Sequence, residues 1–207
     1  MPIRLFHRNF NIIIALILLL SSGFSFHTPQ KAETLIYDIT FNDKKVGYLK
    51  VSRKVENEIS RYSFTSHVHY KLPFKLIEIQ FEIESSFAGD QMLHSFSREK
   101  FNNELRSHCQ VTKDKKGYRI TNDKISYQLD SARISHSLPM LYFNRPGHIG
   151  YVFSERYGRY LSIQKINENR YMLILPNGGR NYYTYSGELC EEVNAAVPFG
   201  KLQFKLQ

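Results

Sequence analysis

The feature that most constrains this chain is an alternation of apolar and polar side chains with a period of two residues. It runs through 34–41, 77–84 and 201–207, and it continues through 60–70 and 124–129. Successive side chains of a strand point to opposite faces, so each segment has one apolar face and one polar face. A helix would scatter these residues around its circumference, and strands of a parallel sheet, buried on both faces, would not alternate so cleanly. The chain therefore predicts an all-β, antiparallel fold.

Short polar turns separate the alternating segments, for example at 42–44 (NDK), 56–58 (ENE), 102–103 (NN) and 177–179 (NGG). Asn, Asp and Gly tolerate the positive φ angles of tight hairpins, and links this short make consecutive strands antiparallel neighbours. We expect a meander of about a dozen strands, and open sheets rarely exceed about ten strands without curling or splitting. The sheet should therefore curl into a barrel or half-barrel, or divide into two packed layers.

Residues 137–143 (SLPMLYF) break the alternation. Ser137 suits a helix N-cap, Pro139 lies in a first-turn position, and Pro146 and Gly147 follow soon after. These are the signals of a helical turn or two. We expect one short helix near 137–143, whose apolar side chains could close one mouth of the curled sheet.

The first residues read as a secretory signal peptide. Arg4 and Arg8 precede the apolar run 12–20 (IIIALILLL), and the small residues 21–23 (SSG) follow it. A basic start, an apolar middle and a small-residue end are the three parts of such a peptide, and the run is well short of the ~20 residues of a spanning helix. An uncleaved anchor is the alternative. No cysteine comes directly after the run, which argues against a lipoprotein anchor.

This interpretation divides the chain into a signal peptide over 1–23, a short linker over 24–33 and a single β domain over 34–207. We expect a periplasmic or secreted protein. No second long apolar run exists, so the cleaved chain should not be an integral helical membrane protein. The formal net charge is +9, and the chain stays basic without Arg4 and Arg8. Basic and acidic residues are interspersed, which favours weak attraction to an anionic envelope surface over nucleic-acid binding.

Several segments together carry a resemblance to a known family. They are 171–187 (YMLILPNGGRNYYTYSG) with the final strand 200–206, the opening 37–39 (YDI) with Gly47 and Tyr48, and the patch 139–142 (PMLY). They resemble the uncharacterised exported bacterial DUF6134 family, and they are also similar to DUF3108-type periplasmic proteins. The resemblance implies a β-rich envelope protein. It implies no reaction, cofactor or catalytic residue.

The aromatic content suggests a binding function. Phe and Tyr are abundant, and a curled sheet with little helix to cover its apolar face could enclose a cavity with a few phenol groups at its mouth, able to hold a lipid or a glycan. Packing within the core is the alternative, since aromatic side chains also pack well between strands. The residues that we expect to bind an apolar or amphiphilic ligand are Phe64, Phe81, Leu141, Tyr142 and Tyr183.

A row of carboxylates supports a second hypothesis. Glu78, Glu82 and Glu84 share the polar face of one predicted strand, where side chains two positions apart lie roughly 6–7 Å from each other. That spacing could suit an inverting hydrolase acting on an envelope polymer. The alternative is a solvated face paired with Lys or Arg of the strands at 45–55 or 91–101. A third hypothesis is a structural or assembly partner that works through its sheet edges.

The metal and thiol candidates are weaker. His67 and His69 flank Val68 and face the same way, but three or four ligands are normally needed, so we expect no metal site and no cofactor. Export would permit a disulfide between Cys109 and Cys190, and two separate buried thiols are the alternative. The chain contains no recognised nucleophile motif, and we assign no catalytic residue.

Overall fold

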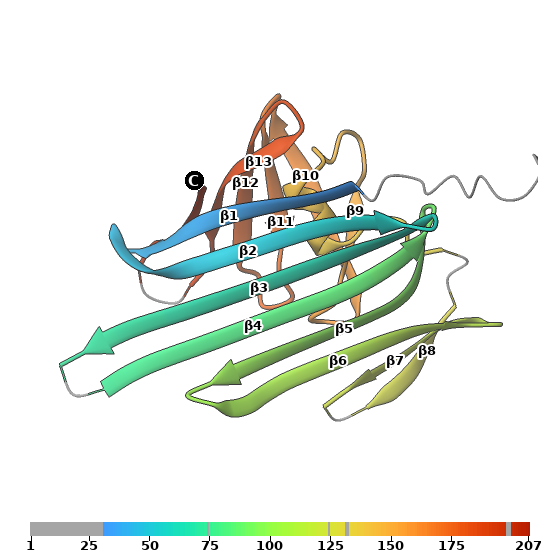
Figure 1. Ribbon diagram of the computed structural model, residues 1–207, viewed down its shortest axis with the longest axis horizontal. Coiled ribbons are helices and arrows are strands. Elements are labelled where there is room, and N and C mark those ends of the chain that lie inside the picture. The colour runs from blue at the N-terminus through green and yellow to red at the C-terminus, as the bar shows by residue number, and fades with distance from the viewer. Residues whose placement is uncertain (1–30, 74, 124, 131–132, 198–199) are drawn as a thin grey trace, which may run out of the picture.

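The computed structural model describes residues 31–73, 75–123, 125–130, 133–197 and 200–207. The predicted signal peptide and most of the predicted linker lie outside these residues. Within them, fourteen strands form a single sheet, shown in Figure 1. The strands are β1 (Lys31–Phe41), β2 (Lys44–Glu56), β3 (Ile59–Leu72), β4 (Lys75–Ala88), β5 (Gln91–Phe101), β6 (Glu104–Asp114), β7 (Gly117–Asn122), β8 (Ser126–Leu129), β9 (Tyr151–Ser154), β10 (Arg159–Asn167), β11 (Arg170–Ile174), β12 (Arg180–Ser186), β13 (Leu189–Ala195) and β14 (Leu202–Leu206).

The strand order is β8-β7-β6-β5-β4-β3-β2-β1-β14-β13-β12-β11-β10-β9. Every paired strand is antiparallel to its neighbour, and each pairs with its neighbour in sequence except at β1–β14. The predicted antiparallel meander is confirmed, and the sheet curls without closing. β1 already begins at Lys31, opposite Val55 of β2, so residues 31–33 belong to the sheet rather than to the predicted linker.

The sheet has two arms. The N-terminal arm holds the long strands β1–β6 with β7 and β8, and the C-terminal arm holds the shorter strands β9–β14, which run behind the long strands at a steep angle in Figure 1. The inward side chains of both arms form one apolar core, with Leu49, Ile83 and Val111 from the first arm and Leu173 and Val193 from the second. Burial of this common face holds the arms together.

The tight turns follow the sequence closely. Both central residues have positive φ at Asn42-Asp43, Asn57-Glu58 and Asn102-Asn103. Two consecutive positive φ angles define the type I′ turn, whose twist matches that of the flanking strands. The turns predicted from Asn, Asp and Gly are therefore confirmed at these three hairpins, and they set the register of β1 with β2, of β2 with β3 and of β5 with β6.

The predicted short helix is also confirmed, as a 3₁₀ turn η1 (Leu138–Tyr142). Ser137 is its N-cap in extended conformation, and Pro139 lies in its first turn, where a missing N–H costs nothing. Leu141, Tyr142 and the following Phe143 are buried in the common core. The turn therefore packs between the arms and contacts β3, β9 and β13.

The two outer strands of the sheet, β8 and β9, limit access to their free edges in different ways. β8 is only four residues long. The edge of β9 is covered, because Phe153 donates its N–H to the carbonyl of His136 at 2.8 Å, next to a parallel bridge from Ser137. The same covering segment accepts the N–H of Met92 at the start of β5 through Ile134. In the described part of the chain, no helix is long and apolar enough to cross a membrane.

Candidate functional site

A cavity of about 300 Å3 lies between the two arms. That volume is at the lower end of the range for small-molecule sites. From the first arm it is lined by inward side chains at every second position of β3 and β4, and from the second arm by β11 to β14. The apolar lining residues include Phe64, Val68, Ile79, Phe81, Ile83, Tyr142, Leu173, Leu175, Tyr183, Val193, Leu202 and Phe204.

The cavity has a buried end and a more open end. Phe64, Ile83, Leu173 and Tyr183 are buried, whereas the other apolar lining residues of β3, β4 and β14, together with Leu175 after β11, are only half-buried. The half-buried set comprises Val68, Ile79, Phe81, Leu175, Leu202 and Phe204. The open end is therefore bounded by apolar side chains that still touch solvent.

A continuous series of aromatic contacts forms one wall. Phe81 meets Phe64 edge-on with ring centroids 5.7 Å apart, and Phe64 meets Tyr142 at 5.6 Å. Tyr142 in turn meets Tyr183 at 6.2 Å, which links the two arms through η1. Edge-to-face pairs of this kind are the favoured geometry for aromatic rings. The wall is thus a series of packed aromatic rings, two of which, Tyr142 and Tyr183, carry a hydroxyl.

Four of the five residues expected to bind a ligand line this cavity: Phe64, Phe81, Tyr142 and Tyr183. Leu141 does not. Its side chain is buried in the core, and its carbonyl accepts a hydrogen bond of 2.8 Å from the hydroxyl of Tyr185. Consecutive residues of a 3₁₀ turn point in different directions, so Tyr142 reaches the cavity and Leu141 does not.

Arg156 lies at the rim of the cavity. Its guanidinium is 5.5 Å from the ring centroids of both Phe81 and Tyr157, and it forms an ion pair with Glu99, which stands opposite Phe81 on β5. Glu99, Arg156 and Tyr157 also line a wider, open hollow next to the cavity. The rim is therefore a charged and aromatic boundary whose two charges are already paired.

A buried carboxyl lies beside the cavity. Glu155, which directly follows β9, has no exposed surface. Its Oε2 accepts the N–H of Leu138 at a long 3.4 Å, and its Oε1 has no hydrogen-bond partner. Burial raises the pKa of this carboxyl from 4.5 to about 7, against the opposing effect of its own backbone N–H, Ser137, Leu138 and Ser85.

Four buried serines lie near Glu155 in the fold or in the sequence. We call Glu155 and these serines the serine–glutamate cluster, which comprises Glu155, Ser85, Ser95, Ser137 and Ser154. Ser85 and Ser95 stand opposite each other on β4 and β5, and Ser137 precedes η1. All four are at most 4% exposed, and none of their hydroxyls makes a hydrogen bond of ordinary geometry. Buried hydroxyls normally have a partner, so the cluster is an unusual concentration of unmet hydrogen-bonding capacity.

The cluster adjoins the buried end of the cavity. Ser154 belongs to the cluster and also lines the cavity. The charge of Glu155 contributes to raising the pKa of Tyr183, after the larger effect of burial, so the carboxyl lies within electrostatic reach of the cavity wall. The sequence pattern did not predict this cluster. The available signal was the presence of Ser85 at an inward position between Ile83 and Phe87 on β4.

Comparison with known proteins decides the family. A family model described as "Domain of unknown function (DUF6134)" matches residues 37–207. The chain belongs to the DUF6134 family. The match covers the whole sheet apart from the first residues of β1, both arms of the cavity and the serine–glutamate cluster. The similarity to DUF3108-type proteins stays an expectation. No curated protein and no solved structure matches the chain.

The carboxylate row of this DUF6134 chain lies on the outer face of β4, away from the cavity. Glu82 forms an ion pair of 2.5 Å with Arg98 of β5, which confirms the expected pairing across strands for this residue. Glu78 accepts a hydrogen bond of 2.9 Å from the side chain of Gln80. Glu84 is exposed. The three carboxylates therefore share a face, as predicted, but no cleft encloses them as a group.

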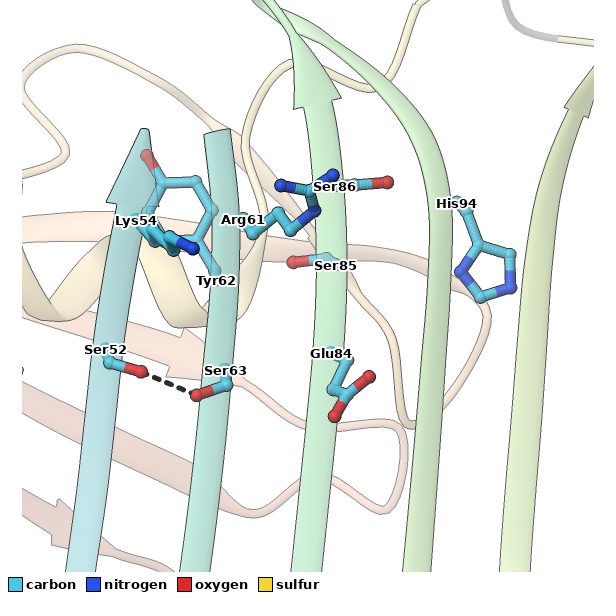
Figure 2. A pocket seen from close by; sticks show the side chains of 9 residues that line it. All are labelled: Ser52, Lys54, Arg61, Tyr62, Ser63, Glu84, Ser85, Ser86 and His94. Carbon is cyan, nitrogen blue, oxygen red and sulfur yellow. Dashed lines mark hydrogen bonds between the residues drawn. The ribbon is translucent and has the colours of Figure 1, made fainter. Parts of the chain in front are cut away.

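Glu84 does line a separate polar hollow of about 410 Å3 over β2 to β5. Figure 2 shows its side chains, which come from four neighbouring strands, and the 2.7 Å hydrogen bond between Ser52 and Ser63. Its cations are already engaged in part, since Arg61 and Lys54 both pair with Glu56. The hollow has no apolar wall comparable to that of the cavity between the arms.

The two histidines considered as metal ligands in this DUF6134 chain contact or face other side chains. His67 stacks on Tyr48, with ring centroids 5.3 Å apart, and His69 stands opposite Glu78. Within the described residues, no three His, Cys, Asp or Glu side chains gather to hold a metal ion. The structure therefore offers no metal centre from which to argue a reaction.

The disulfide that the sequence left open is not formed. Cys109 and Cys190 are both free and buried. Cys109 on β6 packs at the turn that holds Gly158, whereas Cys190 on β13 lies beside Tyr37, whose hydroxyl donates to its carbonyl at 2.5 Å. The two thiols thus belong to different neighbourhoods of the core, which fits the alternative of separate buried thiols.

Proposed function

We propose that this protein binds an apolar or amphiphilic ligand, such as a lipid, in the cavity between the arms, without chemical conversion of that ligand. The observation that supports this most strongly is the aromatic wall from Phe81 through Phe64 and Tyr142 to Tyr183. This wall borders the cavity between the arms. Burial of alkyl surface against such a wall contributes about 25 cal/mol per Å2. A lipid-like ligand fits this lining better than a glycan does, because most of the lining side chains are apolar or aromatic.

The proposed location is the periplasm or the cell exterior. It rests on the signal-peptide pattern of 1–23, and the expected mature chain begins near residue 24. Intact mass measurement of the protein from its own host tests this step. A mass that includes residues 1–23 would contradict it. Attraction to an anionic envelope surface remains a further expectation from the basic composition.

Nothing in the described residues supports the other two functions to the same degree. For a hydrolase, Glu82 is held by Arg98 on an open face. For an assembly partner, one sheet edge is covered by the segment 134–137 and the other is short. Short or covered edges resist pairing with further strands. Both alternatives therefore remain hypotheses without a supporting site.

A cavity-filling substitution tests the proposal. Ile79→Trp would place an indole in the cavity, while Ile36→Trp, on the outer face with 41% exposure, is the matched control. The chain contains no Trp, so each indole also reports on the fold by fluorescence. We expect native mass spectrometry to find a retained or added alkyl ligand on the wild type and the control, and at least about tenfold less on Ile79→Trp. Equal ligand loading of the two variants would overturn the proposal.

A further inference from the structure

We propose, building on the proposed function, that the serine–glutamate cluster binds the hydroxyl-bearing polar end of the ligand, so that an amphiphile lies with its head buried and its tail toward solvent. Among the described residues, five of the seven buried side-chain polar atoms without a hydrogen-bond partner belong to this cluster. Ser154 is the cluster residue that lines the cavity, and a ligand hydroxyl can donate to or accept from its unpartnered hydroxyl.

The distribution of polarity along the cavity sets this orientation. Ser154 is fully buried and lines the cavity, with its hydroxyl unpartnered. The opposite end is bounded by apolar side chains such as Val68, Ile79 and Leu202, which are only half-buried. The more exposed polar lining residues already have partners, since Arg156 pairs with Glu99 and the Oδ1 of Asn181 accepts the N–H of Ala196. The unpartnered hydroxyl therefore lies at the buried end, which favours a head group there.

The charged rim does not compete for the head group. Arg156 is paired with Glu99 and stacked over Phe81 and Tyr157, so an anionic head there would have to displace Glu99. A hydroxyl at the cluster displaces no protein contact. Leaving a buried polar group unsatisfied costs about 1–3 kcal/mol, and a ligand that supplies the missing partners recovers part of that cost on binding.

A pair of matched probes distinguishes the head-buried orientation. The probes are 1-octanol and 1-methoxyheptane, which both have nine non-hydrogen atoms, while the ether lacks the donor. Octanol has nine non-hydrogen atoms, and at roughly 30 Å3 each, the share of a water molecule, it fits the cavity. We expect the wild type to bind octanol about tenfold more tightly than the ether, the effect of about one buried hydrogen bond. Competition with a fluorescent alkyl probe measures both affinities.

Variants locate the preference. Ser154→Ala should bring the octanol affinity down to that of the ether, while Ser66→Ala, another cavity serine outside the cluster, should keep the tenfold difference. In the bound state, intermolecular NMR contacts should run from the alcohol CH2 group to Ser154 and from the terminal methyl group to Val68. The comparison of the two probes on the wild type needs no variant and is informative even if Ser154→Ala does not fold.

The outcomes separate this inference from the proposed function. Equal affinity for the two probes, or the reversed NMR orientation, would overturn the head-buried orientation and leave water as the occupant of the cluster, while binding itself would stand. Failure of both probes to bind would overturn the proposed function, and this inference with it. A tenfold preference lost in Ser154→Ala and kept in Ser66→Ala would support both.

Discussion

Glu155 shows how one residue can set the pH dependence of the whole domain. The carboxyl is fully buried, and its pKa is raised from 4.5 to about 7 by burial. Its charge in turn acts on Tyr183 and Cys109, whose pKa values it helps to raise. Buried carboxyls without full hydrogen bonding are held in the neutral form, because the charged form loses its hydration. The folded protein therefore retains a proton here that the unfolded chain releases.

That retained proton predicts a loss of stability with rising pH. Below about pH 4.5 the carboxyl is protonated in both states, between about 4.5 and 7 only the folded chain keeps the proton, and above about 7 neither does. Stability should fall through this window by on the order of 3 kcal/mol in all. Urea unfolding of the wild type and Glu155→Gln at about pH 5 and about pH 8 measures the difference, which Gln should remove.

The matched control for this measurement is Glu84→Gln, an exposed carboxyl on the outer face of β4. It should keep the wild-type change of stability between the two pH values, because water solvates its charge in both states. If Glu155→Gln keeps the same pH dependence as the wild type, Glu155 is not the group that carries it.

At the scale of elements, the close pairing of β2 with β3 depends on Gly47. A Cβ built at Gly47 would lie 1.9 Å from the carbonyl oxygen of His67 and 3.0 Å from the Cα of Val68. Both are backbone atoms, which cannot rotate away as a flexible side chain can. The position also lies beside the register shift between Ile39 and Thr40 in the β1–β2 pairing. Glycine in a strand interior often marks such a close approach.

Gly47→Ala should therefore destabilise the fold by at least about 2 kcal/mol, within the range of overpacking substitutions. Gly150→Ala is the control, because a Cβ at Gly150 meets no atom within 4 Å, and it should change stability by less than about 0.5 kcal/mol. Urea midpoints measure both. If Gly47→Ala were as stable as the wild type, the prediction would be wrong, and the β2–β3 ladder would be able to shift to admit a methyl group.

The elements themselves were largely predictable from the sequence. Alternation at 34–41 and 77–84 reflects burial of one strand face, and the Asn42, Asn57 and Asn102 turns reflect local φ preferences; both signals are local. The pairing of β1 with β14 and the return of β9–β14 across the first arm depend on contacts distant in sequence. Every strand offers a similar apolar face, so the pattern does not specify which faces meet.

The candidate site was predictable to the same extent. Phe64 and Phe81 could be placed on inward faces by counting in steps of two, and their contact follows from the β3–β4 hairpin. Leu141 is buried but does not line the cavity, because the direction of a side chain in one 3₁₀ turn depends on how that turn packs. Glu155 was overlooked because it follows the end of β9, where alternation no longer predicts burial.

At the scale of the whole molecule, the two arms bury one thiol each in a chain that we propose to be exported. Burial raises the pKa of Cys109 and of Cys190 to about 12 each, which leaves almost no thiolate, the reactive form, near neutral pH. Each thiol also has separate neighbours, so oxidation has no nearby partner. The fold should therefore keep both cysteines reduced in an oxidising compartment.

Thiol labelling checks this protection. We expect the native protein, purified without reductant, to gain no mass from iodoacetamide near neutral pH, and to gain two labels once unfolded in guanidinium chloride. Thr112→Cys, which adds an exposed thiol on the outer face of β6, should gain one label in the native state and three after unfolding. Two labels missing from the unfolded wild type, restored by reduction, would reveal a 109–190 disulfide. That result would require the two arms to pack against each other differently, because the thiols could then no longer occupy separate parts of the core.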